Sequence, residues 1–515
     1  MAEVSAVELD VALGRLASVA EEMGTVLRRT AYSPNIKERA DCSAAVFVPS
    51  GEMIAQAEHI PVHLGSMPES VAAVLGLLGD RVQNGDQFAV NDPYFGGTHL
   101  NDLTLVRPVY FGENLIAWVA NRAHHADVGG EAPGSMPAHA ETVDEEGVRI
   151  APMLAVEGGN WLNGFVDPFL EATRTPPERM GDLSAQLGAN EVGAKRMHHL
   201  ANTLGLEQLH AIYEALLDYS ERRMRAALAQ IPDGEYSFTD WMEWGENDLP
   251  VAASVRVEGD ELEADFSETS AQVAGNINAV EAITRSCLYF AVRVATDPGI
   301  PANGGSYRPL RLSTPPGSLV NSEEPAAVAA GNVETSQRIA DALLGALAQA
   351  VPDRVPAASQ GTMNNVLVGS DDFAYYETVA GGQGGRPGKE GQSGIHTGMT
   401  NTKNTPIEAL ETHYPLRVTR YRLRRSSGGR GQYPGGEGIE RELEFRTEAT
   451  LSLMGERRRH GPWGLAGGEP GAPGEDWLIT SDGRRERLPS KVTFEVSPGD
   501  RLLVLTPGGG GWGKP

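Results

Sequence analysis

Two stretches decide how the chain folds around its most polar segment: NDPYFGGTHLNDLTL at residues 91–105 and ANRAHHADVGGEAPGSMP at residues 120–137. Apolar and β-branched residues predict one strand from Leu103 to Tyr110 and another from Leu115 to Asn121, with a Gly-Glu turn between them. If these strands pair as a hairpin, the start of the first adjoins the end of the second. The two polar stretches therefore meet at one edge of the predicted sheet.

These stretches supply several ionisable side chains. His99 and Asp102 stand just before the first strand, and His124, His125 and Asp127 follow the second. Two imidazoles and one carboxylate, with water in the remaining positions, form an open site for a divalent metal such as zinc, manganese or iron(II). The alternative is a set of satisfied polar residues around a tight turn. We consider it less favourable, because burying so many ionisable groups without a purpose costs free energy.

The two adjacent histidines raise an alternative that the residues alone leave open. Neighbouring side chains of a strand point to opposite faces, so His124 and His125 should not both bind one metal ion if the strand continues through them. The histidine that does not bind could donate hydrogen bonds or act as a general base. His125 or Asp127 could then guide the proton of an attacking water molecule.

Two further groups of polar residues permit two interpretations each. His59 and His63 have helical spacing, and they could support the metal ligands or lie on the surface. Asp182, Gln186 and Asn190 share one face of a predicted helix. That face could contact a site or another subunit, or it could be solvated.

Arginine is concentrated in two places. Arg420, Arg422 and Arg424 alternate on a predicted strand, and residues 457–459 form a second cluster. Such clusters can bind a carboxylate or a phosphorylated ligand by bidentate contacts. We slightly favour the alternative, in which they pair with acidic residues of this chain or of a neighbour.

Composition excludes several classes of protein. The 515 residues include 43 Lys and Arg and 69 Asp and Glu, which gives a net charge of −26 and argues against nucleic-acid binding. The two cysteines exclude a disulfide framework and a thiolate metal cluster. No apolar stretch reaches the roughly 18 residues that span a bilayer. The N-terminus, MAEVSAVELD, lacks the features of an export signal, so we expect a cytoplasmic protein.

Hydrophobic periodicity predicts a mixed α and β (α+β) fold, large and elaborated. A helical N-terminus begins at Ala6, the N-terminal half carries the metal site, and the C-terminal end is β-rich. The predicted regions are 1–234, 235–412 and 413–515. Further predicted helices are 68–78, 206–231, 279–295 and 336–351, and further predicted strands are a pair within AAVFVPSGEMIAQ, 236–243, 253–266 (folded at 258–260), 416–424, 439–445, 450–457 and 492–505.

The common phosphate-loop and nucleophile-elbow motifs are absent from the sequence. It contains no G-x-x-x-x-G-K-[ST] phosphate loop and no G-x-S-x-G nucleophile elbow. A formal G-x-G-x-x-G occurs at Gly508, Gly510 and Gly513, but we expect no helix after it to bind a pyrophosphate. If the chemistry uses ATP, we therefore expect another polypeptide to bind it.

A set of motifs runs along the chain: NIKERADCS (35–43), NDPYFGGTHLND (91–102), AHHADVGG (123–130), PGSMP (133–137), GNINA (275–279), MTNTKNTPIEALE (399–411), PWGLAGG (462–468) and the terminal TPGGGGWG. In these motifs the sequence closely resembles the hydantoinase B/oxoprolinase family, from about residue 6 to its last residues. That family includes subunits of ATP-dependent N-methylhydantoinases and lactamases, the C-terminal half of 5-oxoprolinase, and subunits of acetone and acetophenone carboxylases.

The resemblance implies a division of labour between two subunits. An A-type subunit with an ATPase fold binds ATP and phosphorylates the substrate, and the B-type subunit receives the intermediate at a metal site. By resemblance that site is His99, Asp102 and His124, which favours His124 over His125. Many relatives carry a second histidine where this chain has Gly398, so no role is carried over to His396. The resemblance also suggests an A2B2 heterotetramer.

Three functions remain in competition. The first is a hydrolase subunit that opens a small cyclic amide such as a hydantoin, oxoproline or lactam after phosphorylation by the partner. The second is a subunit of an ATP-dependent ketone carboxylase, in which the same metal would stabilise an enolate. The third is a non-catalytic scaffold for the ATPase subunit. We favour the first, because the chain is shorter than the carboxylase counterpart and carries a candidate metal site.

Overall fold

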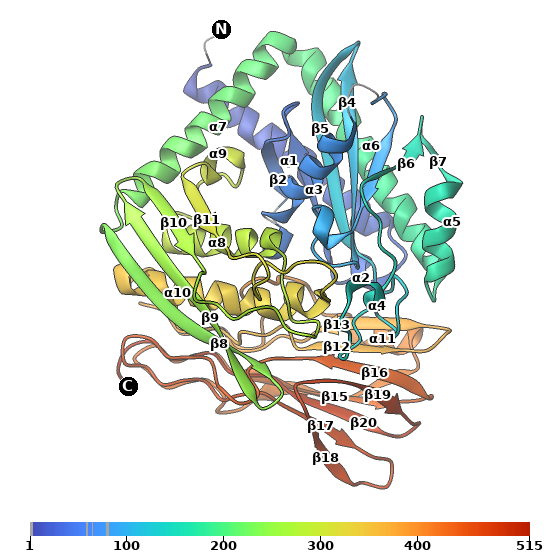
Figure 1. The fold of residues 1–515 in the computed structure, drawn as a ribbon, viewed down its shortest axis with the longest axis vertical. Coiled ribbons are helices and arrows are strands. Elements are labelled where there is room, and N and C mark those ends of the chain that lie inside the picture. The colour runs from blue at the N-terminus through green and yellow to red at the C-terminus, as the bar shows by residue number, and fades with distance from the viewer. Residues whose placement is uncertain (1–3, 58–59, 64, 79–81) are drawn as a thin grey trace.

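The structure is a computed structural model that describes residues 4–57, 60–63, 65–78 and 82–515. The described residues form four β-sheets with helices packed between and around them. An N-terminal sheet with long helices lies above a C-terminal pair of sheets in the view of Figure 1. This arrangement confirms the predicted mixed α and β fold with a helical N-terminus and a β-rich C-terminal region. Among the described helices, none has the length and apolar character that a membrane crossing requires.

The first sheet has the strand order β2-β1-β5-β4-β3-β6-β7 within the described residues. Both of its faces are buried, because Ala44 and Val46 of β1 pack against one set of helices while Ala45 and Phe47 pack against the other. Its strands are β1 (Cys42–Phe47), β2 (Met53–Ala57), β3 (Gln87–Val90), β4 (Asp102–Phe111), β5 (Asn114–His124), β6 (Met153–Glu157) and β7 (Asn160–Trp161).

Long helices cover one face of this sheet. Helix α1 (Ala6–Thr30) begins at a capping box, in which Ser5 accepts the backbone N–H of Glu8 and the Glu8 carboxylate accepts the N–H of Ser5. Helix α6 (Pro176–Leu204) packs against α1 and against β4 and β5. The other helices of this region are α2 (Pro34–Lys37), η1 (Pro61–His63), α3 (Ser66–Leu78), η3 (Pro93–Phe95), α4 (Val143–Glu146), α5 (Asn163–Ala172) and α7 (Leu206–Leu228).

The predicted hairpin of β4 and β5 is confirmed. The strands pair antiparallel from Phe111 opposite Asn114 to Asp102 opposite His124. The turn between them contains Gly112, whose φ of 62° suits glycine. The two polar stretches of the sequence therefore meet at the open end of this hairpin.

A second sheet, ordered β11-β10-β9-β8, packs on two central helices. Its apolar side chains and those of the helices form one continuous core. Helix α10 is preceded by a π-helical turn, a feature often found at functional sites. The elements are β8 (Gly234–Trp244), β9 (Asn247–Glu258), β10 (Glu261–Asp265), α8 (Glu281–Ala295), α9 (Gly304–Tyr307), β11 (Leu310–Ser313), η4 (Gly331–Thr335) and α10 (Ser336–Ala350).

The last two sheets, β13-β12-β16-β19 and β14-β15-β20-β17-β18, share a single hydrophobic core. The prediction of one strand over 492–505 is wrong, because a turn at Gly499 with φ of 88° separates β19 from β20. The elements are β12 (Asn365–Gly369), β13 (Ala374–Thr378), α11 (Ile407–His413), β14 (Leu416–Arg424), β15 (Gly438–Phe445), β16 (Ala449–Met454), β17 (Glu475–Ile479), β18 (Arg485–Leu488), β19 (Lys491–Val496) and β20 (Arg501–Leu505).

The predicted regions 1–234, 235–412 and 413–515 stay a prediction. The first division falls at the start of β8, where the second sheet begins. The sheet β13-β12-β16-β19 takes strands from both sides of residue 412.

A cluster of extended glycine segments lies beside these sheets. The segment 508–511 lies between other extended glycine segments. Gly509 donates its N–H to the carbonyl of Gly436 at 2.9 Å, and its own carbonyl accepts the N–H of Gly429 at 2.8 Å. A Cβ on Gly509 would lie 2.0 Å from the carbonyl oxygen of Gln383, so only glycine allows this approach. The formal G-x-G-x-x-G motif therefore has a packing role in the structure.

Substituting Gly509→Ala should destabilise the protein by about 3 kcal/mol or more, because the methyl group overlaps backbone atoms that cannot yield. Urea unfolding measures the difference. The control is Gly188→Ala in α6, where a Cβ meets nothing within 4 Å among the described residues and alanine favours the helix. A Gly509→Ala variant as stable as the control would contradict the packing described for this cluster.

Candidate metal centre

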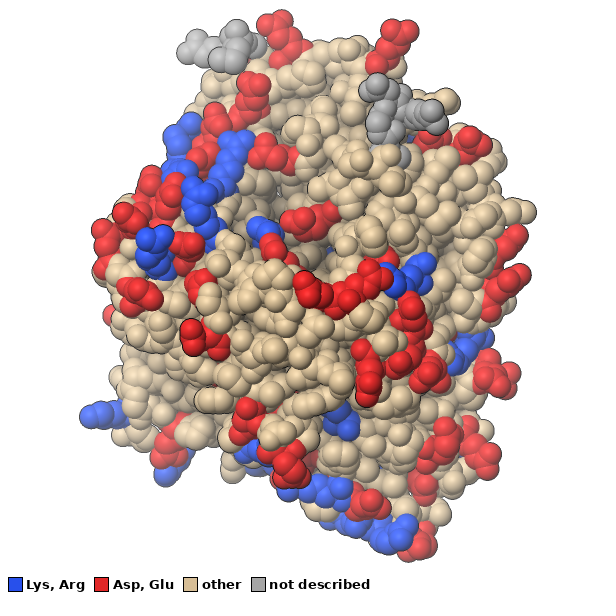
Figure 2. All heavy atoms as spheres, viewed as in Figure 1, with Lys and Arg blue, Asp and Glu red and all other residues tan. Residues whose placement is uncertain are grey.

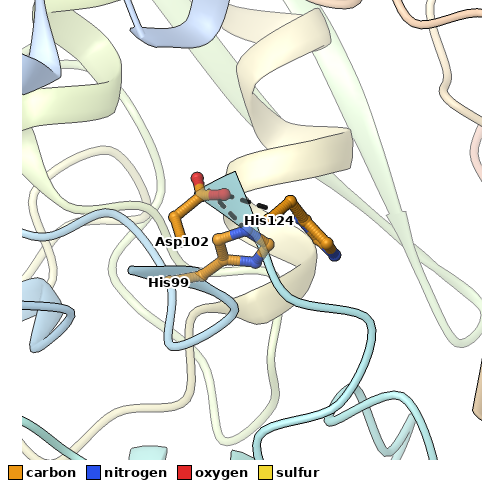
Figure 3. A group of neighbouring side chains, drawn as sticks. All are labelled: His99, Asp102 and His124. Atoms are coloured by element: carbon orange, nitrogen blue, oxygen red, sulfur yellow. Dashed lines mark ion pairs between the residues drawn. The ribbon is translucent and has the colours of Figure 1, made fainter. Parts of the chain in front are cut away.

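The open end of the β4–β5 hairpin brings together His99, Asp102 and His124 (Figure 3). Each offers a ligand atom, and these atoms all lie within 4.8 Å of one another. His99 Nε2 is 3.3 Å from Asp102 Oδ2, and His124 Nδ1 is 3.5 Å from Asp102 Oδ1. All three side chains are buried. These are the three residues that the resemblance predicts as metal ligands.

The hydrogen bonding of this group fits a cation. Both ring nitrogens of His99, Oδ1 of Asp102 and Nε2 of His124 are buried without a hydrogen-bond partner among the described residues. Such groups cost free energy unless something satisfies them. Imidazole nitrogens and a carboxylate oxygen are ligands of zinc, manganese and iron, so the donor set could hold one of these ions.

Protonation favours metal binding as well. Burial opposes ionisation of Asp102, but the neighbouring His99 and His63 outweigh it and hold the pKa of the carboxyl well below its usual range. Burial lowers the pKa of His124 to about 3, so this imidazole is neutral at pH 7. Metal ligands must be deprotonated, and both residues are already in that form.

His63 and Ser43 connect the site with a cavity. His63 Nε2 lies 3.3 Å from Asp102 Oδ2, and its Nδ1 lies 2.8 Å from the hydroxyl of Ser43. Thr98 donates a hydrogen bond of 2.8 Å to the same Asp102 oxygen. His63 is buried, so the interpretation that places it on the surface is wrong, and its contact with Asp102 supports the other. His59 lies outside the described residues.

Sequence reasoning missed Asp41. Burial raises the pKa of its carboxyl to about 6, and the charge of Asp102 adds to the increase while Arg39 and His99 oppose it. The carbonyl oxygen of Asp41 accepts the N–H of His124 at 3.1 Å. Asp41 directly precedes β1, and β1 pairs with β5. This pairing brings Asp41 beside His124, and no signal in the sequence indicates it.

His125 and Asp127 lie outside the group of three ligands. His125 Nε2 contacts Gln186 Oε1 on α6 at 2.9 Å, on the face of the sheet opposite His124. Asp127 accepts the N–H groups of Gly129 at 3.1 Å and Gly134 at 3.0 Å, and it also pairs with an arginine. Asp127 thus organises the loop that follows β5. The catalytic roles of both residues stay a prediction.

The polar face of α6 binds the sheet. Gln186 donates to the carbonyl of Leu103 at 2.9 Å, and Asn190 donates to the carbonyl of Leu105 at 3.1 Å. Asp182 accepts the backbone N–H of Ser33 at 3.0 Å. The interpretation as a solvated face is therefore wrong, because all three side chains are fully buried. Gln186 and Asn190 hold α6 against β4, and Asp182 holds it against the segment before α2.

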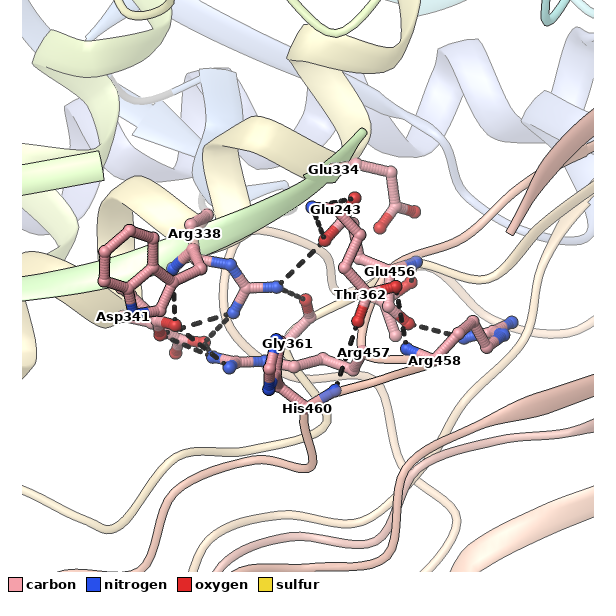
Figure 4. Close-up of polar contacts among 12 residues, drawn as sticks. Glu243, Glu334, Arg338, Asp341, Gly361, Thr362, Glu456, Arg457, Arg458 and His460 are labelled. Carbon is pink, nitrogen blue, oxygen red and sulfur yellow. Dashed lines mark hydrogen bonds and ion pairs between the residues drawn. The ribbon is translucent and has the colours of Figure 1, made fainter. Parts of the chain in front are cut away.

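The arginine clusters have acidic partners within this chain, as favoured from the sequence. Figure 4 shows part of a buried network between α10, β8 and the segment after β16. Acidic and basic side chains are also interspersed on the face drawn in Figure 2. The pairs are Arg420 and Arg422 with Glu440, Arg424 with Glu475, Arg457 with Asp240 and Asp341, Arg458 with Asp476, and Arg459 with Asp248.

Two cavities adjoin near the site. The smaller, of about 250 Å³, has Ser43 in its wall. It shares Phe290, Val294 and Pro298 with a larger cavity of about 470 Å³, whose wall also contains His396. A mostly apolar wall with a few polar groups is typical of a small-molecule site.

Substituting Asp102→Asn should weaken binding of a divalent metal by at least about 100-fold, because the change removes the charged ligand itself and not merely an outer partner. Equilibrium dialysis against zinc, manganese and iron(II), followed by elemental analysis, measures the affinity. The control is Asp182→Asn, an equally buried carboxylate on the other side of the sheet. Equal metal content in wild type and Asp102→Asn would rule out this centre.

Comparison with known proteins agrees with this picture. The family model for hydantoinase B/oxoprolinase matches residues 5–515. An uncharacterized protein of Methanocaldococcus jannaschii is 41% identical over 500 residues, covering 96% of this chain and 88% of its own length. The 5-oxoprolinase 1 of Arabidopsis thaliana is 38% identical over 99% of this chain, which spans only 42% of that protein.

A solved structure shares the whole fold. The ATP-dependent caprolactamase from Pseudomonas jessenii superposes with a TM-score of 0.93 at 30% identity, covering 100% of this chain and 92% of that one. Sequence and structure agree over nearly the full length of the chain. The chain therefore belongs to the hydantoinase B/oxoprolinase family.

Proposed function

We propose that this chain is the metal-bearing subunit of an ATP-dependent cyclic amidase of the hydantoinase, oxoprolinase or lactamase type. In this proposal an A-type ATPase partner binds ATP and phosphorylates the substrate, and this chain hydrolyses the intermediate. The observation that carries the proposal is the buried group of His99, Asp102 and His124 with its unsatisfied ligand atoms. The names of the relatives, a 5-oxoprolinase and an ATP-dependent caprolactamase, support the substrate class.

His99, Asp102 and His124 would hold the metal ion. A bound divalent ion would supply Lewis acidity and lower the pKa of a bound water molecule. Asp102 contributes the negative charge. His63 orients the Asp102 carboxylate through Nε2, while its Nδ1 is held by the hydroxyl of Ser43. These contacts fix the ligand geometry before any substrate arrives.

The two adjoining cavities are the proposed binding place of a small cyclic amide. Phe290, Val294 and Pro298 offer apolar contacts to a ring, and Ser43 offers a hydroxyl that also contacts His63. Phosphorylation of the amide oxygen by the partner would remove the amide resonance and make the ring carbon easier for water to attack. Loss of the ring nitrogen from the adduct would open the ring, and hydrolysis of the resulting acyl phosphate would release phosphate. The role of His125 or Asp127 as a guide of the water proton also remains a proposal.

The partner assignment rests on the family to which the chain belongs. The sequence has no phosphate-loop motif, in keeping with ATP binding outside this chain. The proposal therefore places ATP binding in an A-type partner, within an A2B2 heterotetramer.

Reconstitution tests the function. The chain is purified with its A-type partner, and ATP hydrolysis and product formation are followed across lactams, hydantoins, oxoproline and ketones, with and without bicarbonate. We expect ring opening coupled to ATP hydrolysis and independent of bicarbonate. Asp102→Asn should reduce product formation at least about 100-fold. Losses of this size are typical when one stabilising group of a catalytic site is removed.

Two outcomes would contradict the proposal. Full activity of Asp102→Asn in metal-free buffer would indicate a scaffold without its own chemistry. Product formation that requires bicarbonate and a ketone would indicate a carboxylase subunit. The variant Asp182→Asn is the control for loss of stability, because this carboxylate is equally buried on the opposite side of the sheet.

A further inference from the structure

The imidazole of His124 lies flat against an aromatic ring from a distant part of the chain. Tyr376, on β13, stacks on it with ring centroids 4.5 Å apart and an interplanar angle of 10°. His99, the other histidine of the centre, is tilted by 54° to His124 at 5.0 Å. Of these two neighbouring rings, Tyr376 therefore restricts the plane of the His124 imidazole more closely.

The tyrosine is itself anchored at its far end. Its hydroxyl donates to Asn365 Oδ1 at 2.9 Å. Asn365 in turn donates to Glu334 Oε1 at 2.8 Å and to the carbonyl of Met454 at 3.0 Å. Tyr376 is only 3% exposed, so it has little room to move away from His124.

Arg39 ties the tyrosine and the histidine to one another. Its guanidinium lies 4.7 Å from the centroid of the Tyr376 ring and donates to the Tyr376 carbonyl at 2.9 Å and to Thr378 Oγ1 at 2.9 Å. It also donates to Asn35 Oδ1, and Asn35 donates to the carbonyl of His124 at 2.6 Å. Backbone and ring of His124 are thus both held through β13.

We propose that Tyr376 is a positioning residue of the metal centre, which holds the His124 imidazole in the plane that directs Nδ1 toward Asp102. The inference rests on the proposed function only in assuming that these residues bind a metal ion. It assigns a part in the N-terminal site to the strand β13 of the C-terminal sheets. Removal of the ring frees the imidazole to rotate, and the ligand geometry is lost before the metal arrives.

The experiment compares substitutions at two adjacent tyrosines of β13 in the full chain. Tyr376→Leu removes the stacked ring, and Tyr376→Phe keeps the ring but removes the hydrogen bond to Asn365. Tyr375→Leu is the matched control, because Tyr375 is equally buried but packs into the core on the opposite face of β13. Zinc affinity is measured by competition with a chromophoric chelator, and the absorption spectrum of the cobalt(II) form reports the ligand geometry.

We expect Tyr376→Leu to bind zinc about 10-fold more weakly, the lower end of the range for residues that orient metal ligands, and to alter the cobalt(II) spectrum. Tyr376→Phe and Tyr375→Leu should stay within about 3-fold of wild type, within the scatter of such effects. Tyr376→Met, whose flexible unbranched side chain fills irregular gaps in a core, replaces the leucine variant if that variant does not fold.

Other outcomes overturn the inference. Wild-type affinity and spectrum in Tyr376→Leu would show that the ring does not position His124. An equal loss in Tyr375→Leu would show a general packing effect, and an equal loss in Tyr376→Phe would assign the effect to the hydroxyl. A wild-type chain that binds no more zinc than Asp102→Asn would overturn both the proposed function and this inference. The outcomes above concern Tyr376 alone and leave the proposed function in place.

Discussion

The register of one hairpin determines the candidate site. Asp102 lies opposite His124 in the ladder between β4 and β5, and a shift by one residue would place His125 on the side of Asp102 instead. In the observed register a buried carboxylate faces imidazoles. Its pKa stays well below the usual range because His99 and His63 outweigh the effect of burial. A buried charge is tolerated only with such partners, so the pairing of the strands and the chemistry of the site depend on each other.

Packing on both sides of the sheet holds this register. On one side Gln186 and Asn190 of α6 bind the carbonyl oxygens of β4. On the other side Tyr376 stacks on His124, and Arg39 connects β13 to the segment before β1. The site therefore lies where the N-terminal sheet meets the C-terminal sheets, although the nearest residues of those sheets are far away in sequence.

Local signals were enough to predict the helices α1, α7, α8 and α10, many of the strands, and the polar residues that meet at the hairpin. The choice of His124 over His125 came from the family resemblance. The hairpin of 103–110 and 115–121 has alternating apolar residues and a glycine turn, and such a pattern fixes which polar residues meet. Asp41 and Tyr376 could not be found in this way, because their contacts depend on the pairing of β1 with β5 and on the docking of β13. Long-range packing decided both of these cases. The strand predicted over 492–505 failed for a local reason, because Pro498 and Gly499 form a turn that the prediction overlooked.

The most direct test of the account is a crystal structure of the metal-loaded chain with anomalous diffraction recorded at the metal absorption edge. The account predicts one strong anomalous peak at the open end of the β4–β5 hairpin. Nitrogen atoms of His99 and His124 and an oxygen of Asp102 should lie at roughly 2.0–2.2 Å from it if the ion is zinc. A peak bound by other residues, or a fully loaded crystal without a peak at this position, would contradict the account.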